Sequence, residues 1–367
     1  MKTVILTDGK YRSALAAARD LGRRGFRVIV TQTRGDCDQT PPVFSSQFAQ
    51  GQWIEGCVAD PDYPERLLAC IRREESGEKP VLLCVGAGSL RMVAARRESF
   101  ARYADFLIAR PEELDALNDK QTVHDRARTL GLTVPRQYAG TPDRYPVVVK
   151  PHCGEKLGLK AADRYAVAEN ETEYNKIYRA MCRYDPEPIV QERVQGPGRG
   201  VSLLLDRESR LIGAICHRRL REYPMSGGPS TCCVTEFDAQ RIHQAAELLR
   251  SFGFTGLAMV EFKGDAILEV NPRIWGSFPL VPFAGSPMLE RYVLAAGGQR
   301  LEYAAQDYQL GRKMRFCFND LAASADLLRH GKLRAGCGGL LDFFRVREAL
   351  KDREDKKAYR AYLKSYL

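Results

Sequence analysis

The pattern of apolar and polar positions predicts regular elements from the first residues of the chain onward. Short apolar runs predict strands at 3–7, 26–30, 81–85 and 106–109. Apolar residues at helical spacing predict helices at 13–25, near 64–75 and from about 90. Strands that alternate with helices form a parallel sheet covered by helices. We therefore expect a Rossmann-like α/β domain over residues 1–110.

The pattern changes from Pro111 onward. Helices are expected at 111–120, 122–130, 171–182 and 238–252, with a highly charged last helix near 344–366. Strands are expected at 145–150, 189–194, 201–206, 211–217, 257–263 and 267–271. The usual dinucleotide fingerprint is missing after the first strand, and Gly86-Ala87-Gly88 alone indicates only a turn that enters a helix. NAD is therefore not assigned.

The last two of these strands, 257–263 and 267–271, carry acidic residues. Side chains alternate between the two faces of a strand. If the apolar residues of both strands form one layer, Glu261 lies directly across from Glu269, and Asn271 lies one pleat further on. A slip of one residue would expose the apolar set, so the apolar pattern selects this register.

This register predicts both a turn and a ligand. It requires a connection of three residues, 264–266, in which glycine tolerates a left-handed backbone. Two glutamates that face each other repel, so we expect a cation between them. Mg²⁺ prefers a few carboxylates together with substrate phosphates. We predict a Mg²⁺ site, able to take Mn²⁺ as well, formed by Glu261, Glu269 and Asn271. The alternative is a solvated strand face.

Several segments in a fixed order resemble the ATP-grasp enzymes. After the Rossmann-like leader they are Asp119-Lys120, 147–151, 190–194, 259–262 and 268–273. The resemblance, which covers roughly residues 1–290, implies a nucleotide held between two α+β subdomains. The expected fold is thus α/β and α+β. A Rossmann-like N-terminal domain at 1–110 precedes an ATP-grasp fold, with a small lid subdomain at 111–188, a large metal-binding subdomain at 189–300 and a C-terminal extension at 301–367.

The resemblance also implies which residues contact ATP. Lys120 and Lys150 would bind phosphate oxygens as compact point charges. The loop at 153–158 would cover the phosphates, with Gly154, Lys156 and Gly158 as contacts. Because residues 155 and 156 are large where small residues are usual, the sequence leaves open whether backbone N–H groups or the Lys156 charge make that contact. For each lysine and for the loop, a merely structural or exposed position is the alternative.

Two further sets of residues follow from the resemblance. The segment of Gln191, Glu192, Arg193 and Val194 would hydrogen-bond the adenine, the alternative being a surface strand end. Arg273 would pair with the transferred phosphoryl group or the acyl phosphate. The stretch 217–231 resembles the carboxylate–amine ligase branch, and there Arg219 and Arg221 would hold the substrate carboxylate and its acyl phosphate. Structural salt bridges or a basic, solvated strand are the alternatives.

The predicted function is therefore that of an ATP-dependent ligase. It would form an amide bond through an acyl phosphate, with amino acids as expected carboxylate and amine substrates, and release ADP and phosphate. Bicarbonate as the carboxylate, giving carboxyphosphate, is the first alternative. A non-catalytic nucleotide-binding protein is the second, although the complete metal set argues against it.

The composition and charge of the chain limit the classes of binding partner that we expect. The chain has 367 residues, is 44% hydrophobic and 28% charged, and lacks the long apolar stretch of a signal peptide or membrane helix, so we expect a cytoplasmic, multidomain protein. Its net charge of +10 is spread along the chain, which favours an anionic small substrate over nucleic acid. Eleven scattered cysteines indicate reduced thiols, several of them buried. A homodimer is compatible with the sequence.

Overall fold

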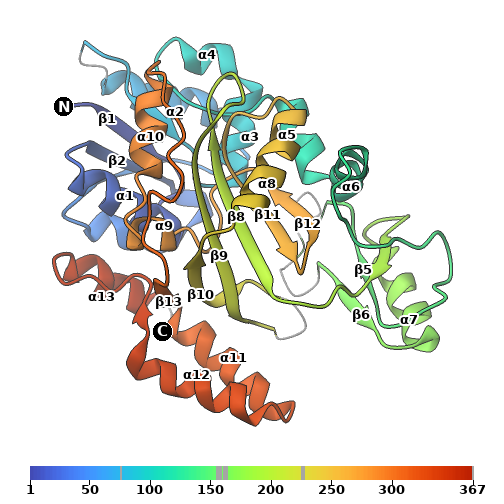
Figure 1. Cartoon of the computed structure of the whole chain (residues 1–367). Helices are drawn as coiled ribbons and strands as arrows, with labels where there is room; N and C mark the ends of the chain where they lie inside the picture. Colours follow the sequence, from blue (N-terminus) through green and yellow to red (C-terminus); the bar gives the residue numbers. More distant parts are fainter. Residues whose placement is uncertain (75–76, 154–158, 160–163, 225–227, 366–367) are drawn as a thin grey trace.

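The N-terminal residues form the parallel sheet that the sequence predicts. The computed structural model describes residues 1–74, 77–153, 159, 164–224 and 228–365, and Figure 1 shows its arrangement. The sheet has the order β3-β2-β1-β4, and all neighbouring strands are parallel. Its strands and helices are β1 (Thr3–Leu6), α1 (Arg12–Arg23), β2 (Arg27–Thr33), β3 (Gln50–Ile54), α2 (Tyr63–Arg73), β4 (Val81–Leu83), α3 (Ala87–Ala95) and α4 (Arg97–Ala101).

Two details of this domain differ from the expectation. The apolar pattern gives no sign of β3, because only its last residue, Ile54, is buried. The strand expected at 106–109 is instead a buried segment outside the named strands, and the residue before it, Asp105, makes an isolated parallel bridge to Val81. The sheet therefore gains an unpredicted edge strand on one side and loses a predicted one on the other.

The alternating residues of β1 show how this sheet is covered. Val4 and Leu6 belong to the core that contains α1, whereas Ile5 belongs to the core that contains α2 and α3. Both faces of the sheet are thus buried under helices. A parallel sheet of this kind has continuous apolar strands rather than alternating ones, which explains the runs seen in the sequence.

A seven-stranded sheet forms the centre of the molecule, in the order β12-β11-β8-β9-β10-β13-β14 (Figure 1). The unpredicted strand β10 extends it, and β9 continues past its expected end at 217. Helix α8 packs on one face, against residues such as Val201 and Ala258, while Leu257 and Met259 face the core shared with α1. The elements of this region are β8 (Gly198–Leu205), β9 (Leu211–Glu222), β10 (Ser230–Glu236), α8 (Ala239–Ser251), β11 (Gly256–Lys263), β12 (Ala266–Asn271), α9 (Leu280–Phe283) and α10 (Met288–Ala296).

A smaller sheet with the order β6-β5-β7 stands apart from the N-terminal domain, at the other end of the molecule (Figure 1). It consists of the antiparallel strands β5 (Val147–Lys150), β6 (Ala166–Ala168) and β7 (Ile189–Glu192), and α7 (Glu171–Met181) packs on it. Because β7 pairs with β5, the small sheet extends past the boundary expected at 188. Helices α5 (Pro111–Asn118) and α6 (Lys120–Thr129), expected in the small subdomain, instead contact β12 of the large sheet.

The C-terminal extension is part of the same body as the large sheet. Strand β13 (Lys313–Arg315) pairs with β10, and β14 (Arg347–Glu348) pairs with β13. Helices α11 (Cys317–Arg329) and α12 (Leu333–Arg345) pack against each other below β9 and β10 (Figure 1). The helix expected near 344–366 is interrupted by β14, so the last helix is α13 (Lys356–Lys364). A buried ion pair of 2.8 Å between Arg19 and Asp355 attaches this segment to α1.

Two expectations about the whole chain can be compared with the structure. All eleven cysteines are free, and those that are buried are Cys70, Cys84, Cys216, Cys232 and Cys233. This confirms several buried thiols. Within the described ranges, no helix is both long and apolar enough to cross a membrane.

Candidate active site

The hairpin of β11 and β12 places two glutamates opposite each other. Glu261 pairs with Glu269, and Met259 pairs with Asn271. This is the pairing that the apolar pattern predicts. The three candidate metal ligands therefore lie close together at the end of the large sheet, all of them partly buried.

A bulge at Leu268, rather than a three-residue turn, sets this register. Lys263 pairs with Ala266, so the connection contains only Gly264 and Asp265. The predicted three-residue connection is thus wrong, and the odd residue lies inside β12. Gly264 has a φ of +55°, the left-handed backbone that glycine adopts freely.

The bulge decides which face Glu269 occupies. Ile267 and Val270 both join the apolar layer beneath α8, although an uninterrupted strand would point them to opposite faces. Without the extra residue at Leu268, Glu269 would share the buried face of Ile267. The bulge turns Glu269 to the face that carries Glu261.

Positively charged side chains surround this pair of carboxylates. Arg219 Nη2 lies 2.5 Å from Glu261 Oε2, and Lys120 Nζ lies 3.5 Å from Glu269 Oε2. Asn271 Nδ2 donates to Glu261 Oε1 at 3.1 Å. The predicted metal ligands and two of the predicted anion-binding residues are therefore brought together in one cluster.

Glycines in β8 make room for this cluster. Strand β8 runs between β9 and β11, so a side chain of β9 must cross it to reach Glu261. A Cβ at Gly198 would lie 3.1 Å from Cδ of Arg219, and a Cβ at Gly200 would lie 2.3 Å from Cε1 of His217. The missing side chains allow Arg219 and His217 to lie over the β8 backbone.

Burial and neighbouring charges both shift the pKa values of the groups in this cluster. Burial outweighs Arg219 and, together with Glu269, raises the pKa of Glu261. Burial also opposes ionisation of Glu269, but Lys120 and Lys150 outweigh it and lower the pKa of Glu269. Burial and the neighbouring Lys120 lower the pKa of Lys150 to about 7. The site thus balances two carboxylates against three cations.

Both lysines are fixed by local structure. Asp119 caps α6, because its side chain accepts from the Thr122 N–H at 2.7 Å, and Lys120 therefore begins the helix. The Lys120 N–H donates to the His152 carbonyl at 3.2 Å. Lys150 ends β5 of the small sheet and is buried, with Nζ 3.4 Å from the Leu268 carbonyl oxygen. The two lysines thus approach the hairpin from different elements.

The four predicted adenine contacts connect the small sheet to the tip of the hairpin. The Glu192 carboxylate accepts from the Arg136 N–H at 2.9 Å, so it already has a backbone partner. The Arg193 N–H donates to the Pro146 carbonyl at 3.3 Å. Gln191 is buried, and its Oε1 lacks a hydrogen-bond partner among the described residues. Val194 lies beside Gly264, and the adenine-binding role of all four stays a prediction.

Arg221 does not join the cluster. Its guanidinium donates to both oxygens of Asp320, at 2.7 and 2.8 Å, and to Asp342 at 2.8 Å. These acids lie on α11 and α12, so the side chain is directed toward the C-terminal helices. These contacts engage the Arg221 donors with two buried or partly buried carboxylates, and its role toward a substrate carboxylate stays a prediction.

The remaining predicted residues lie near the hairpin or outside the described ranges. Arg273 follows β12, is partly buried and donates to the Ile274 carbonyl at 3.0 Å, so a phosphoryl-binding role stays a prediction. Gly154, Lys156 and Gly158 lie outside the residues that the structure describes. The loop's role toward phosphates is therefore also still a prediction.

Two histidines at the site were not among the sequence-predicted residues. His124 is fully buried on α6, four residues after Lys120, and its Nε2 lies 3.0 Å from the Leu268 carbonyl oxygen. Burial and Lys150 lower its pKa to about 4. His217 is buried on β9, and its Nε2 lies 3.3 Å from Ser277 Oγ. The four-residue spacing of Lys120 and His124, which puts both on one helix face, is a signal that could have identified His124.

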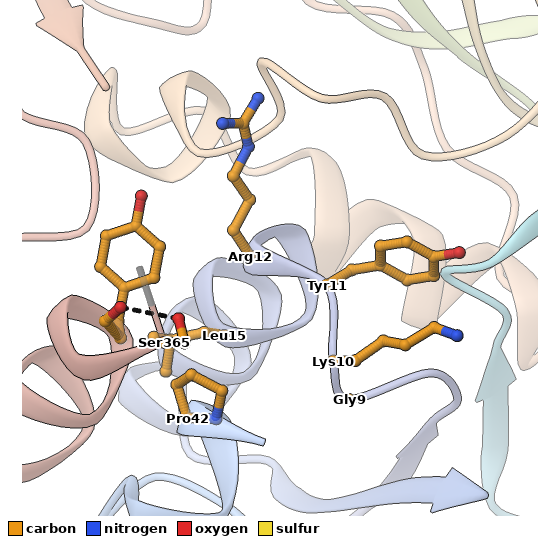
Figure 2. Close-up of a pocket in the computed structure, with 8 residues that line it drawn as sticks. Gly9, Lys10, Tyr11, Arg12, Leu15, Pro42 and Ser365 are labelled. Carbon is orange, nitrogen blue, oxygen red and sulfur yellow. Dashed lines mark hydrogen bonds between the residues drawn. The ribbon is translucent and has the colours of Figure 1, made fainter. Parts of the chain in front are cut away.

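A cavity of about 270 Å³ lies apart from this cluster, next to the loop between β1 and α1 (Figure 2). Figure 2 shows Arg12 pointing away from Pro42 and Ser365. Arg12 Nε donates to the Gly276 carbonyl at 3.2 Å, so it joins the N-terminal domain to the segment after β12. The described residues that line the cavity are Gly9, Lys10, Tyr11, Arg12, Leu15, Pro42, Tyr362 and Ser365, none of them a predicted site residue.

A comparison with protein families identifies the domain that carries the cluster. Residues 117–277 match the sequence model of the ATP-grasp domain. The chain therefore contains an ATP-grasp domain. The matched segment runs from the end of α5 past β12 and contains every predicted site residue, from Lys120 to Arg273. This match confirms the predicted enzyme class, an ATP-dependent ligase. Among curated proteins, no sequence matches the chain.

Solved structures share the fold of this ATP-grasp protein. The biotin carboxylase domain dimer of Hydrogenobacter thermophilus 2-oxoglutarate carboxylase, in complex with MgADP, ADP and bicarbonate, is 13% identical, with a TM-score of 0.62 over 85% of this chain and 73% of that one. A biotin carboxylase–β,γ-ATP complex from Campylobacter jejuni is 15% identical, with a TM-score of 0.63 over 85% and 74%. Rhizobium etli pyruvate carboxylase is 12% identical, with a TM-score of 0.60 over 85% of this chain and 30% of that one. These likenesses confirm the predicted ATP-grasp fold.

The donor set of this ATP-grasp protein fits a hard divalent ion. Glu261 and Glu269 are partly buried carboxylates, with side chains 14% and 34% exposed, and the Asn271 amide oxygen is a further possible oxygen ligand. In the part of the chain that the structure describes, no three His, Cys, Asp or Glu side chains are grouped to hold a metal. An ion bound by two glutamates and an asparagine would therefore complete its shell with oxygens from outside the protein, such as nucleotide phosphates.

Proposed function

We propose that this ATP-grasp enzyme activates a small carboxylate as an acyl phosphate and transfers the acyl group to an amine, with amino acids as substrates. The observation that supports the proposal is the pairing of Glu261 with Glu269 on one face of the hairpin, beside Lys120, Lys150 and Arg219. Two carboxylates and three cations in one partly buried cluster suit a metal-bound triphosphate, whose charges would replace the present ion pairs.

The first step would transfer the γ-phosphoryl group. A substrate carboxylate oxygen attacks the γ-phosphorus, the bond from that phosphorus to the bridging oxygen breaks, and ADP leaves. Lys120 and Lys150 would bind phosphate oxygens, while Glu261, Glu269 and Asn271 would hold Mg²⁺. When bound, Mg²⁺ neutralises charge on the phosphate oxygens.

The second step would form the amide bond. The amine nitrogen attacks the acyl carbon, the bond from that carbon to the phosphate oxygen breaks, and the nitrogen loses a proton as phosphate leaves. A fixed guanidinium stabilises the negative charge that develops on the oxygens. Arg219, which the β8 glycines allow to reach the cluster, and Arg273 are the residues proposed for this role. Arg221 is not proposed for this role, because its side chain is paired with Asp320 and Asp342.

Bicarbonate is a second candidate for the activated carboxylate. It is favoured by the structural likeness to biotin carboxylase domains, one of which is described in complex with MgADP and bicarbonate. Bicarbonate would give carboxyphosphate by the same first step. That relative is also described as a domain dimer, which supports the proposal that the present chain forms a homodimer.

The experiment that tests the function is a screen for ADP release. Purified protein is incubated with ATP, Mg²⁺ and amino acids in pairs, in buffer depleted of carbon dioxide, and products are identified by mass. An amide product formed together with ADP supports the ligase. ADP release that requires bicarbonate and no organic acid replaces it with the carboxyphosphate reaction. Nucleotide binding without turnover under any condition overturns both and leaves a non-catalytic binding protein.

A further inference from the structure

The backbone carbonyl of Leu268, the bulge residue of β12, lies within hydrogen-bond distance of two side-chain donors. The Leu268 carbonyl oxygen lies 3.0 Å from His124 Nε2 and 3.4 Å from Lys150 Nζ. These donors come from different subdomains, since His124 is on α6 and Lys150 is on β5 of the small sheet. A bulge interrupts the ladder, so its carbonyl group needs partners of this kind from outside the hairpin.

The partners of His124 fix its tautomer. A carbonyl oxygen only accepts, so the hydrogen bond to Leu268 requires the proton on Nε2. Gln137 Nε2 lies 3.1 Å from His124 Nδ1 and donates to Gln121 Oε1 at 2.9 Å, while Gln137 Oε1 accepts from Arg128 at 2.7 Å. The amide of Gln137 is therefore oriented as a donor toward Nδ1, which leaves the imidazole with a single N–H on Nε2.

We propose that His124 is a positioning residue of this enzyme, because its hydrogen bond to the Leu268 carbonyl holds the bulge that turns Glu269 toward Glu261. The inference rests on the proposed function, in which Glu269 binds the metal. That function would also draw Lys150 to the phosphates, and His124 would then be the donor left on the bulge. Groups that orient a metal ligand in this way contribute about 10- to 100-fold to metal affinity.

The position of His124 in the helix supports this role. Lys120 and His124 are four residues apart and lie on one face of α6, so a single helix contacts both Glu269 and the residue before it. Helix α6 packs directly on β12. The two contacts are therefore coupled, and a loss of the histidine donor would change the placement of Glu269 without removing any ligand.

Three variants of His124 test the proposal. Gln places a donor N–H close to the position of Nε2, Asn places it near Nδ1, and Leu has none. ADP binding is measured by calorimetry with and without Mg²⁺. We expect His124→Leu and His124→Asn to raise the half-saturating Mg²⁺ concentration about 10-fold or more, and His124→Gln to restore it. ADP binding in the absence of Mg²⁺ should change by less than about twofold in all three, since no predicted nucleotide contact is removed.

The outcomes separate the inference from the proposed function. If Mg²⁺ does not strengthen ADP binding in the wild-type protein, the metal site itself is refuted. If Mg²⁺ does so equally in wild type and His124→Leu, the positioning role is refuted. Should His124→Leu not fold, nitrogen chemical shifts of the wild-type histidines still decide, because an imidazole protonated on Nδ1 instead of Nε2 would contradict the proposed hydrogen bond.

Discussion

Arg219 and Glu261 form a 2.5 Å ion pair although their strands are not neighbours. Strand β8 runs between them, and Arg219 crosses it over Gly198, where any side chain would meet the arginine. Both side chains are largely buried, at 16% and 14% exposed. The charge of Glu261 is therefore compensated inside the protein by a residue that the β8 glycines admit.

This relationship predicts a strong coupling between the two residues. Arg219→Met should lower the free energy of unfolding by roughly 3–5 kcal/mol, because it leaves a buried carboxylate without its partner. Glu261→Gln combined with Arg219→Met should recover most of that loss, since neither charge is then stranded. Urea unfolding of both single variants and the double variant gives the coupling energy. Equal losses in Arg219→Met and in the double variant would contradict the pairing.

Glu269 is expected to matter for turnover rather than for folding. Glu269→Gln keeps the shape of the side chain but removes the negative charge that the proposed metal site requires. We expect kcat to fall by at least about 100-fold, with an unfolding transition close to that of the wild type. Glu65→Gln, at an exposed position on α2, serves as the control and should keep full activity. Full activity in Glu269→Gln would remove this carboxylate from the metal site.

Arg221, in contrast to Glu269, is expected to matter for folding rather than for turnover. Asp320 is fully buried, so Arg221→Met leaves its carboxylate with less compensation and should cost roughly 3 kcal/mol of unfolding free energy. The KM values for substrates should stay within about twofold, because the side chain is directed away from the cluster. Arg218→Met on the same strand is the control, and its half-exposed ion pair with Glu236 should contribute little. A large rise in KM without loss of stability would restore the substrate role first expected for Arg221.

The hairpin shows how far the sequence alone can define the site. Alternating apolar residues place Glu261 opposite Glu269 because any other register exposes part of the core. They do not distinguish a three-residue turn from a two-residue turn followed by a bulge, since both give that pairing. The choice depends on donors from outside the hairpin, His124 and Lys150, which meet the Leu268 carbonyl only in the folded protein.

Two of the arginines of β9, Arg219 and Arg221, show why the roles of other site residues could not be predicted. In the sequence, Arg219 and Arg221 have the spacing of residues on one strand face, and no feature of the sequence separates their roles. In the structure, the pairing of β9 with β10 shifts register between them. Their partners in the folded protein separate the two roles. Arg219 pairs with Glu261, whereas Arg221 pairs with Asp320 and Asp342, which belong to the segment beyond the family resemblance. The Rossmann-like sheet was predictable because its strands are continuous apolar runs, whereas the polar edge strand β3 has no such pattern.

Glu348 gives the stability a specific pH dependence. It is buried on β14, its Oε2 accepts from the Leu350 N–H at 2.7 Å, and its Oε1 has no partner among the described residues. Burial raises its pKa from an ordinary 4.5 to about 7. Between these values the folded protein binds more protons than the unfolded chain does. The stabilisation from the protonated carboxyl is therefore complete below about pH 4.5 and is lost as the pH rises through 7.

Glu348→Gln should remove this dependence. The neutral amide mimics the protonated acid, so the variant should exceed the wild type in unfolding free energy at pH 8 by up to about 3 kcal/mol, and by much less at pH 5. Urea unfolding at both pH values measures the difference, with the exposed Glu65→Gln as a matched control for the loss of one charge. A gain of the same size at pH 5 and pH 8 would show that packing of the amide, and not the cost of ionising a buried carboxyl, sets the stability at this position.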